Sequence, residues 1–272
     1  MKVTSDNSAL KRRSLAGYVD WLQSNGHYTF SRKQYQTQFH VSDNVFMTAA
    51  HRLATKGRLI KPVRGFYAIV PLEYSKAKNI PVSWYIDDLM RYLGANYYIS
   101  LLSAAALYGA GHQQPQVFQV FSDIRHRDIV VRENRIKIIT ISGIERHHCQ
   151  KNKTQTGYYA IGIPEQVAVD LVRFYKYSGY LNNVATVLSE IADQLSPDKI
   201  VQCAQTADMP TAQRLGYLLD FIEEGERAKP LLDYVTQQVK RYVKLRPDLE
   251  SDTLMRDKKW KLHVNERIEL DI

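Results

Sequence analysis

One short stretch of the chain carries side chains of the kinds that read the edges of DNA bases. It runs from Ser42 to Gly57. Its apolar residues Val45, Ala49 and Leu53 recur every four positions, which predicts a helix with these three residues facing a core. On the opposite face, an asparagine amide could bond adenine and an arginine guanidinium could bond guanine, each through two hydrogen bonds. The candidate base-reading residues are Asn44, Met47, Thr48, His51 and Arg52.

Other residues nearby could hold the phosphate backbone. Ser31 and Arg32 start a second predicted helix, and a helix N-terminus attracts phosphate because its free N–H groups point outward. A basic run after the third helix could reach phosphates or the minor groove. The candidate backbone contacts are Ser31, Arg32, Lys56, Arg58, Lys61 and Arg64, with Lys11, Arg12 and Arg13 as a further basic cluster.

The elements that must position these side chains follow from hydrophobic periodicity and from turn residues. Three helices and a β-hairpin are predicted, in the order of a winged helix-turn-helix. Gly57 would end the third helix, and Gly65 suits the tight turn of the hairpin. The predicted helices span Asn7–Ser24, Ser31–Phe39 and Ser42–Gly57, the third with Phe46 and Ala50 widening its apolar face, and the predicted strands span Arg58–Val63 and Phe66–Val70.

The charge of the chain is concentrated in this first quarter. Residues 1–70 hold 11 Lys and Arg against 3 Asp and Glu, whereas residues 71–272 hold 26 against 25. A net charge of +8 on one part of the chain indicates a polyanionic partner for that part. Two readings remain open, a DNA-binding domain and a winged domain that binds protein. RNA recognition is disfavoured, because the sequence has neither an aromatic RNP motif nor a GXXG loop.

The rest of the chain predicts a larger α+β domain. Pro71–Pro81 is polar and bounded by prolines, so it is interpreted as a linker between a domain at 1–80 and a domain at 81–272. β-rich runs come first and helical patterns follow, which is typical of a mixed sheet with helices. Helices are predicted at 84–93, 103–110, 165–174 after Pro164, 181–195, 197–205, 211–223 and 229–242, and strands at 97–101, 117–121, 129–131, 135–141, 157–161 and 259–264.

No motif for catalysis, a cofactor or a metal stands out. The sequence lacks G-x-S-x-G, a P-loop and G-x-G-x-x-G. His147, His148 and Cys149 are adjacent, and neighbours on a strand point to opposite faces, which suits one metal ion poorly. Cys149 and Cys203 form no C-x-x-C pair and are expected to be reduced thiols. We therefore expect a protein that is not an enzyme and that needs no cofactor or metal.

A second basic surface is predicted in the larger domain. Residues 125–153 hold eight Lys and Arg against three Asp and Glu, on strands and connecting loops. This surface could bind nucleic acid or an acidic protein, or it could be the solvated side of an ordinary antiparallel sheet. Its candidate residues are Arg125, Arg127, Arg132, Arg135 and Lys137.

The composition indicates a cytoplasmic protein. No stretch approaches the roughly 20 apolar residues of a membrane span. Met1–Arg13 is polar and basic and leads into no apolar segment, unlike a secretory signal.

Several longer segments resemble the AbiEi family, the antitoxins of AbiE-type toxin–antitoxin systems, which are classed as type IV and act in abortive infection of phage. The most specific part is Ser100–Val120, with the run Leu-Leu-Ser-Ala-Ala-Ala-Leu-Tyr-Gly-Ala. The similarity runs along most of the chain. It is carried by residues 65–74, 84–93, 98–110, 112–120, 183–188, 213–219 and 260–266.

This resemblance implies a function for each domain. The winged domain would bind inverted repeats in its own promoter on double-stranded DNA and repress the operon, with two copies on the DNA. The C-terminal domain would counteract a cognate toxin that resembles a nucleotidyltransferase, directly or indirectly. The family supplies no motif with an assigned antitoxin role, so no residue is carried over for that activity.

Two other functions compete with this one. The chain could be a transcriptional regulator whose C-terminal domain binds a small effector, which would require an apolar pocket with a few converging polar groups. It could also be an enzyme that acts on nucleic acid, which would require clustered carboxylates or metal ligands that the sequence does not offer.

Overall fold

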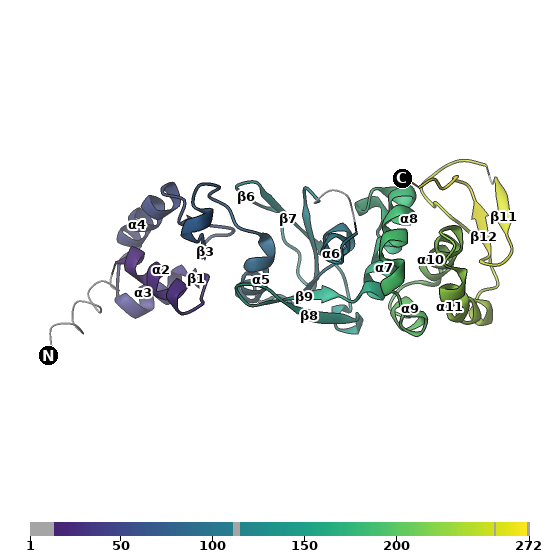
Figure 1. Ribbon diagram of the computed structural model, residues 1–272, viewed down its shortest axis with the longest axis horizontal. Helices are drawn as coiled ribbons and strands as arrows, with labels where there is room; N and C mark the ends of the chain where they lie inside the picture. The colour runs from purple at the N-terminus through teal and green to yellow at the C-terminus, as the bar shows by residue number, and fades with distance from the viewer. Residues whose placement is uncertain (1–13, 111–114, 253, 271–272) are drawn as a thin grey trace.

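The computed structural model describes residues 14–110, 115–252 and 254–270. Figure 1 shows an elongated molecule whose parts follow the order of the chain. A small unit of helices with a three-stranded sheet lies at the N-terminal end, a six-stranded sheet lies in the middle, and helices with a second three-stranded sheet lie at the far end. The prediction of an α+β chain with a mixed sheet followed by helices is confirmed.

The N-terminal unit, residues 15–70, contains the predicted helices and hairpin and one strand that was not predicted. That strand includes Phe30 and pairs antiparallel with the second hairpin strand. The part of the predicted first helix before Ser14, with the cluster Lys11–Arg13, lies outside the described residues. The elements are α2 (Leu15–Ser24), β1 (Thr29–Ser31), α3 (Arg32–Phe39), α4 (Asp43–Thr55), β2 (Leu59–Ile60) and β3 (Phe66–Ile69).

Local sequence explains where these helices begin and end. At the start of α3 the Gln34 N–H donates to the Ser31 hydroxyl at 3.1 Å, and the Ser31 N–H donates to the Gln34 side-chain oxygen at 2.6 Å. This reciprocal pair is a capping box, which satisfies two N–H groups that the helix cannot. His40 has φ 51° and Gly57 has φ 72°, the left-handed conformation that commonly follows a helix, and they lie just beyond α3 and α4.

The core of the N-terminal unit corrects the predicted apolar face of α4. Phe46 is fully buried and Ala50 is 4% exposed, whereas Val45 is 59% exposed. Ala49 and Leu53 pack against this core and are only partly buried. Adjacent helix positions point about 100° apart, so α4 cannot centre both Val45 and Phe46 on the core. The aromatic ring gains more from burial, and α4 is turned to enclose it.

Strand β3 is buried on both faces and lies between two hydrophobic cores. Tyr67 and Ile69 belong to the core under α2, α3 and α4. Phe66 and Ala68 belong to the core of the rest of the molecule. Because side chains alternate along a strand, the four residues of β3 are divided equally between the two cores.

The predicted linker is packed against the middle of the molecule. It contains a 3₁₀ turn, η1 (Leu72–Tyr74), and leads into η2 (Val82–Trp84) and α5 (Ile86–Tyr92). Ile80 is buried in the larger core, and the side-chain amides of Asn79 and Asn134 bond each other. The division into domains at residue 80 stays a prediction.

The middle of the molecule is a mixed sheet in the order β6-β7-β5-β4-β9-β8. β5 pairs parallel with β7 and β4 pairs parallel with β9, while the β4–β5, β6–β7 and β8–β9 pairs are antiparallel. Strand β8 was not predicted, because none of its five residues is buried. The elements are β4 (Tyr97–Ile99), α6 (Leu101–Leu107), β5 (Phe118–Ser122), β6 (Ile129–Val131), β7 (Asn134–Thr140), η3 (Ile144–Arg146), β8 (Cys149–Lys153) and β9 (Tyr158–Gly162).

The far end of the molecule is helical and carries a small sheet in the order β10-β12-β11. Trp260 is fully buried against α10, where a Cβ atom on Gly216 would overlap its ring, and its indole N–H donates to Asp220 at 2.6 Å. The elements are α7 (Pro164–Arg173), η4 (Tyr175–Tyr177), α8 (Tyr180–Ile191), η5 (Ala192–Gln194), α9 (Pro197–Ala204), α10 (Met209–Phe221), α11 (Gly225–Gln238), β10 (Val243–Lys244), β11 (Met255–Asp257) and β12 (Leu262–Val264).

Among the residues that the structure describes, no helix has the length and apolar character to cross a bilayer.

Candidate nucleic-acid interface

The structure gathers the predicted base-reading residues on the exposed side of α4. All five of them are exposed, and Lys56 is exposed just after the helix ends. Val45, which was expected in the core, joins this surface. The exposed face of α4 consists of Asn44, Val45, Met47, Thr48, His51 and Arg52.

Two side chains of α3 fix the direction of α4. Asp43, in its first turn, accepts a hydrogen bond from the Gln36 amide at 2.6 Å and an ion-pair contact from Arg32 at 3.4 Å. Both partners lie on α3. The Arg32 guanidinium, predicted to meet phosphate, therefore also ties α3 to α4, and its side chain is 29% exposed.

The other predicted backbone contacts differ in how free they are. Lys61 and Arg64 are exposed in the turn between β2 and β3. Arg58 is held by α2, because its guanidinium bonds Asp20 at 2.9 Å and Gln23 at 3.2 Å. Its side chain is only 16% exposed. The turn thus offers two free cations, while Arg58 also joins the hairpin to α2.

Two apolar side chains of α4 are exposed, and of these the sequence had placed Met47 on the exposed face and Val45 in the core. Val45 is 59% exposed and Met47 is 43% exposed. The Met47 sulfur lies 3.9 Å from the Tyr67 hydroxyl, so this side chain leans on β3. The sequence signal that could have found Val45 is the neighbouring Phe46, since only one of two adjacent apolar residues can point directly into the core.

One residue of the predicted second basic surface, Arg132, lies beside the C-terminal end of α4. Arg132, in the turn between β6 and β7, donates from its guanidinium to the Ala54 carbonyl at 3.2 Å. A cation near the last carbonyl groups of a helix interacts favourably with its dipole. Lys137 is directed elsewhere, with its ammonium 4.8 Å from the centre of the Tyr177 ring. Arg125, Arg127 and Arg135 are exposed.

A buried polar cluster around Asp170 joins α7 to the middle sheet. Asp170 on α7 is fully buried and accepts hydrogen bonds from the Ser100 hydroxyl at 2.7 Å, the Tyr98 hydroxyl at 3.0 Å and the Gln166 amide at 3.0 Å. Burial raises the pKa of this carboxyl group to about 6, against the opposing effect of its three hydrogen bonds. No group of three His, Cys, Asp or Glu side chains suited to a metal ion occurs within residues 14–110, 115–252 and 254–270.

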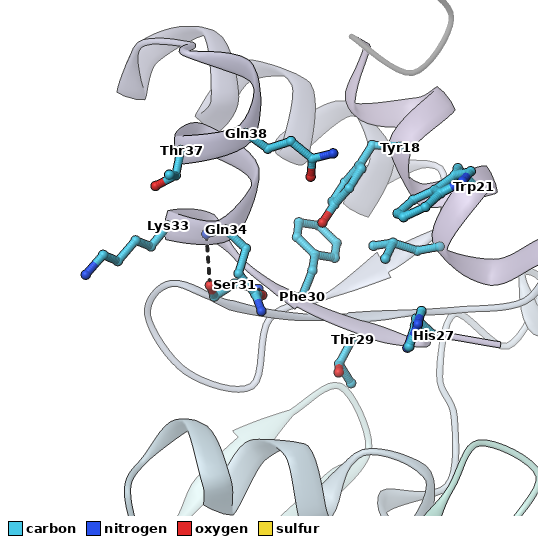
Figure 2. A pocket seen from close by; sticks show the side chains of 11 residues that line it. Tyr18, Trp21, His27, Thr29, Phe30, Ser31, Lys33, Gln34, Thr37 and Gln38 are labelled. Atoms are coloured by element: carbon cyan, nitrogen blue, oxygen red, sulfur yellow. Dashed lines mark hydrogen bonds between the residues drawn. The ribbon is translucent and has the colours of Figure 1, made fainter. Parts of the chain in front are cut away.

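A largely apolar groove of about 660 Å³ lies on the N-terminal unit, between α2, β1 and α3. Figure 2 shows Tyr18 and Trp21 from α2 and Phe30 from β1 along it, while Lys33 on α3 points away into solvent. The dashed line marks the bond between Ser31 and Gln34 that caps α3. Two polar side chains that line the groove, Ser31 and Gln34, are therefore already hydrogen-bonded in the cap of α3.

One family model matches the middle of the chain. Residues 98–221, which run from within β4 to the end of α10, match the family described as AbiEi antitoxin C-terminal domain. This match covers less than half of the chain, and over these residues the resemblance found in the sequence is confirmed.

Solved structures agree on the fold over a longer range. The crystal structure of the RV2827C protein from Mycobacterium tuberculosis is similar with a TM-score of 0.63 and 17% identity, over 93% of this chain and 90% of that one. A nucleotidyltransferase-like antigenic protein from Paracoccidioides brasiliensis aligns with a TM-score of 0.36 and 10% identity, over 58% of this chain and 92% of that one, which is too weak to carry an argument. No curated protein matches the chain.

Proposed function

We propose that the chain is the antitoxin of a bicistronic toxin–antitoxin system of the abortive-infection type, and that it also represses its own operon. The N-terminal unit would be a winged helix-turn-helix that binds inverted repeats in the promoter on double-stranded DNA, with two copies bound. One observation carries this proposal: a helix with an exposed, polar and basic face stands at the end of a chain that matches the AbiEi antitoxin domain, in the part that holds nearly all of the excess positive charge.

In this proposal α4 enters the major groove. Asn44 would bond adenine and Arg52 would bond guanine, with Thr48 and His51 between them. The N-terminus of α3, near Ser31, would meet a phosphate. Lys61 and Arg64 would contact the backbone from the β2–β3 turn, supported by their exposure on the same unit.

The second basic surface would extend the contact with the DNA backbone. Its support is the bond from Arg132 to the end of α4, because this bond brings the β6–β7 turn next to the candidate reading helix. Arg125, Arg127 and Arg135 would then follow phosphates beyond the half-site. Lys137 is the weakest member, since its ammonium is engaged by Tyr177.

The C-terminal domain would counteract a nucleotidyltransferase-like toxin, directly or indirectly, without catalysis or a cofactor. The match to the AbiEi antitoxin domain supports a cognate toxin as partner. The competing function, an effector-binding C-terminal domain, gains no support from the apolar groove, because that groove lies on the N-terminal unit.

The test of the proposal is binding of the purified protein to the duplex just upstream of its own gene, with a scrambled duplex of the same composition as control. Measurements at two salt concentrations separate base recognition from charge, since contacts to phosphate weaken steeply with salt. The expected result is tighter binding to the upstream duplex than to the scrambled one, with the affinity falling as the salt concentration rises. Equal and weak binding to both duplexes would reject the repressor role and favour a protein-binding N-terminal unit.

The antitoxin role has its own test, which does not depend on DNA binding. The protein is co-expressed with the toxin gene of the same operon from an unrelated promoter, and growth is measured. Rescue by the wild type and by Arg52→Ala is expected, because the exposed face of α4 has no part in neutralisation. Failure of the wild type to rescue growth would contradict the antitoxin assignment.

A further inference from the structure

Val45 is an apolar residue that α4 places in solvent. Its side chain is 59% exposed, although a valine in a helix of a small domain is ordinarily buried in the core. From this helix, Phe46 and Ala50 belong to the core of the N-terminal unit, and Ala49, Leu53 and Ala54 pack against it. Within the described residues, Val45 neither belongs to this core nor packs against it. Its exposure is therefore not explained by folding.

The position of Val45 on α4 places it among the candidate base contacts. It precedes Thr48 by three residues and Arg52 by seven, and these spacings put side chains on one side of a helix. Asn44 is its neighbour in the chain. Met47, the other exposed apolar residue of α4, differs because its sulfur rests 3.9 Å from the Tyr67 hydroxyl.

The surroundings of Val45 favour DNA over a protein partner. The exposed face of α4 contains His51 and Arg52 and no aromatic residue, whereas protein interfaces concentrate aromatic anchors. Asp43 is the acidic residue of the helix, and its carboxylate is tied to Arg32 and Gln36 on α3. A polyanion with an apolar group at its surface fits this face.

The major groove of DNA presents one such group, the C5-methyl of thymine. We propose that Val45 contacts a thymine methyl group in the operator, beside the base pair that Asn44 reads. A valine in a helix has one strongly preferred rotamer, so fixing it against a methyl group costs little side-chain entropy. The inference rests on the proposed function, and it adds a base preference at a particular residue.

The experiment compares the upstream duplex with duplexes in which thymines are replaced by uracil, one at a time. This change removes the methyl group and leaves base pairing intact. For the wild type, removal of the contacted methyl should weaken binding about fourfold, the value of one buried carbon group. Val45→Ala should bind the unmodified duplex more weakly by a similar factor and should no longer respond to that uracil.

Leu254→Ala is the control, because it removes an exposed apolar side chain just before β11, away from α4, and should keep the wild-type response to uracil. Thermal unfolding of Val45→Ala should equal that of the wild type, since the side chain is largely outside the core. If every uracil duplex affects the wild type and Val45→Ala alike, or affects neither, the thymine contact is wrong and the repressor role stands. If the wild type binds the unmodified upstream duplex no more tightly than a scrambled duplex, the proposed function itself fails, together with this inference.

Discussion

At the scale of single residues, Asp170 shows how hydrogen bonds allow a carboxyl group of α7 to be buried against the middle sheet. Its carboxyl group is fully buried and is surrounded by donors from β4, the residue after it and α7 itself. Burial disfavours the ionised form and raises the pKa from 3.8 to about 6, while the bonds from Ser100, Gln166 and Tyr98 and the charge of Arg173 favour ionisation and limit the rise.

This raised pKa predicts a pH dependence of stability. The folded state holds the Asp170 proton more tightly than the unfolded state, so the contribution is complete below about pH 4 and is lost as the pH rises towards about 6. Across that window the free energy of unfolding should fall by up to about 3 kcal/mol. Asp170→Asn removes the titration, and its stability relative to the wild type should improve over the same window in urea unfolding at pH 4.5, 5.5 and 7.

Asp128→Asn is the control for this prediction, because Asp128 is exposed in the loop before β6. Its stability relative to the wild type should change little between the three pH values. A pH profile for Asp170→Asn that runs parallel to the wild type would show that Asp170 does not titrate in this range.

At the scale of elements, the two helices of the candidate reading motif begin in different ways. Ser31 starts α3 with a capping box. Ser42 starts α4 without a side-chain cap bond. Ser31→Ala should lower the free energy of unfolding by about 1 kcal/mol, because the Gln34 N–H loses its acceptor, the Ser31 hydroxyl. Ser42→Ala should leave it nearly unchanged, and denaturant unfolding of both variants checks the difference. Equal losses would mean that capping does not distinguish the two helices.

The elements also show what sequence reasoning could and could not find. Long periodic patterns predicted α7, α8 and α10 to within a few residues, and the turn at Gly65 predicted the hairpin. β8 was missed because its residues, Cys149–Lys153, carry no alternating apolar pattern and join the sheet through backbone pairing with β9. β1, β10 and β11 were missed because they have only two or three residues and, unlike the equally short β6, no run of β-branched residues marks them.

For the candidate site, residue types were predictable and orientation was only partly so. The exposed set from Asn44 to Arg52 followed from helical spacing. The placement of Val45 failed because α4 has apolar residues at adjacent positions, and the choice between them depends on the shape of the core. The engagement of Arg58 by α2 and of Arg132 by the end of α4 depends on long-range contacts, which no local pattern contains.

At the scale of the whole molecule, the two basic surfaces predict the salt dependence of DNA binding. Each phosphate contact that is lost lowers the slope of log affinity against log salt by about 0.9. Substitution of Arg52, Lys61 and Arg64 together by alanine should weaken binding, and the loss of the two phosphate contacts from Lys61 and Arg64 should reduce the slope by up to about 1.8. An unchanged slope would reject this assignment.

The same measurement tests whether the DNA reaches the second basic surface. Replacing both Arg125 and Arg127 by glutamine should reduce the slope by up to about 1.8 if phosphates follow that surface. Lys258→Gln is the control, since it removes a cation just after β11, at the other end of the molecule (Figure 1). If the glutamine pair behaves like this control, the second surface is solvated and does not contact DNA.

The division of β3 between two cores has a consequence for how such proteins can be recombined. A gene fragment that ends after β3 would encode α2, α3 and α4 complete with their own core, yet it would expose Ile60, Phe66, Ala68 and Val70 on the back of the sheet. An apolar patch of this kind promotes association with whatever surface is nearby. The N-terminal unit can therefore not be transferred alone. A chimeric protein that contains it also needs a partner surface that covers these apolar residues of the sheet.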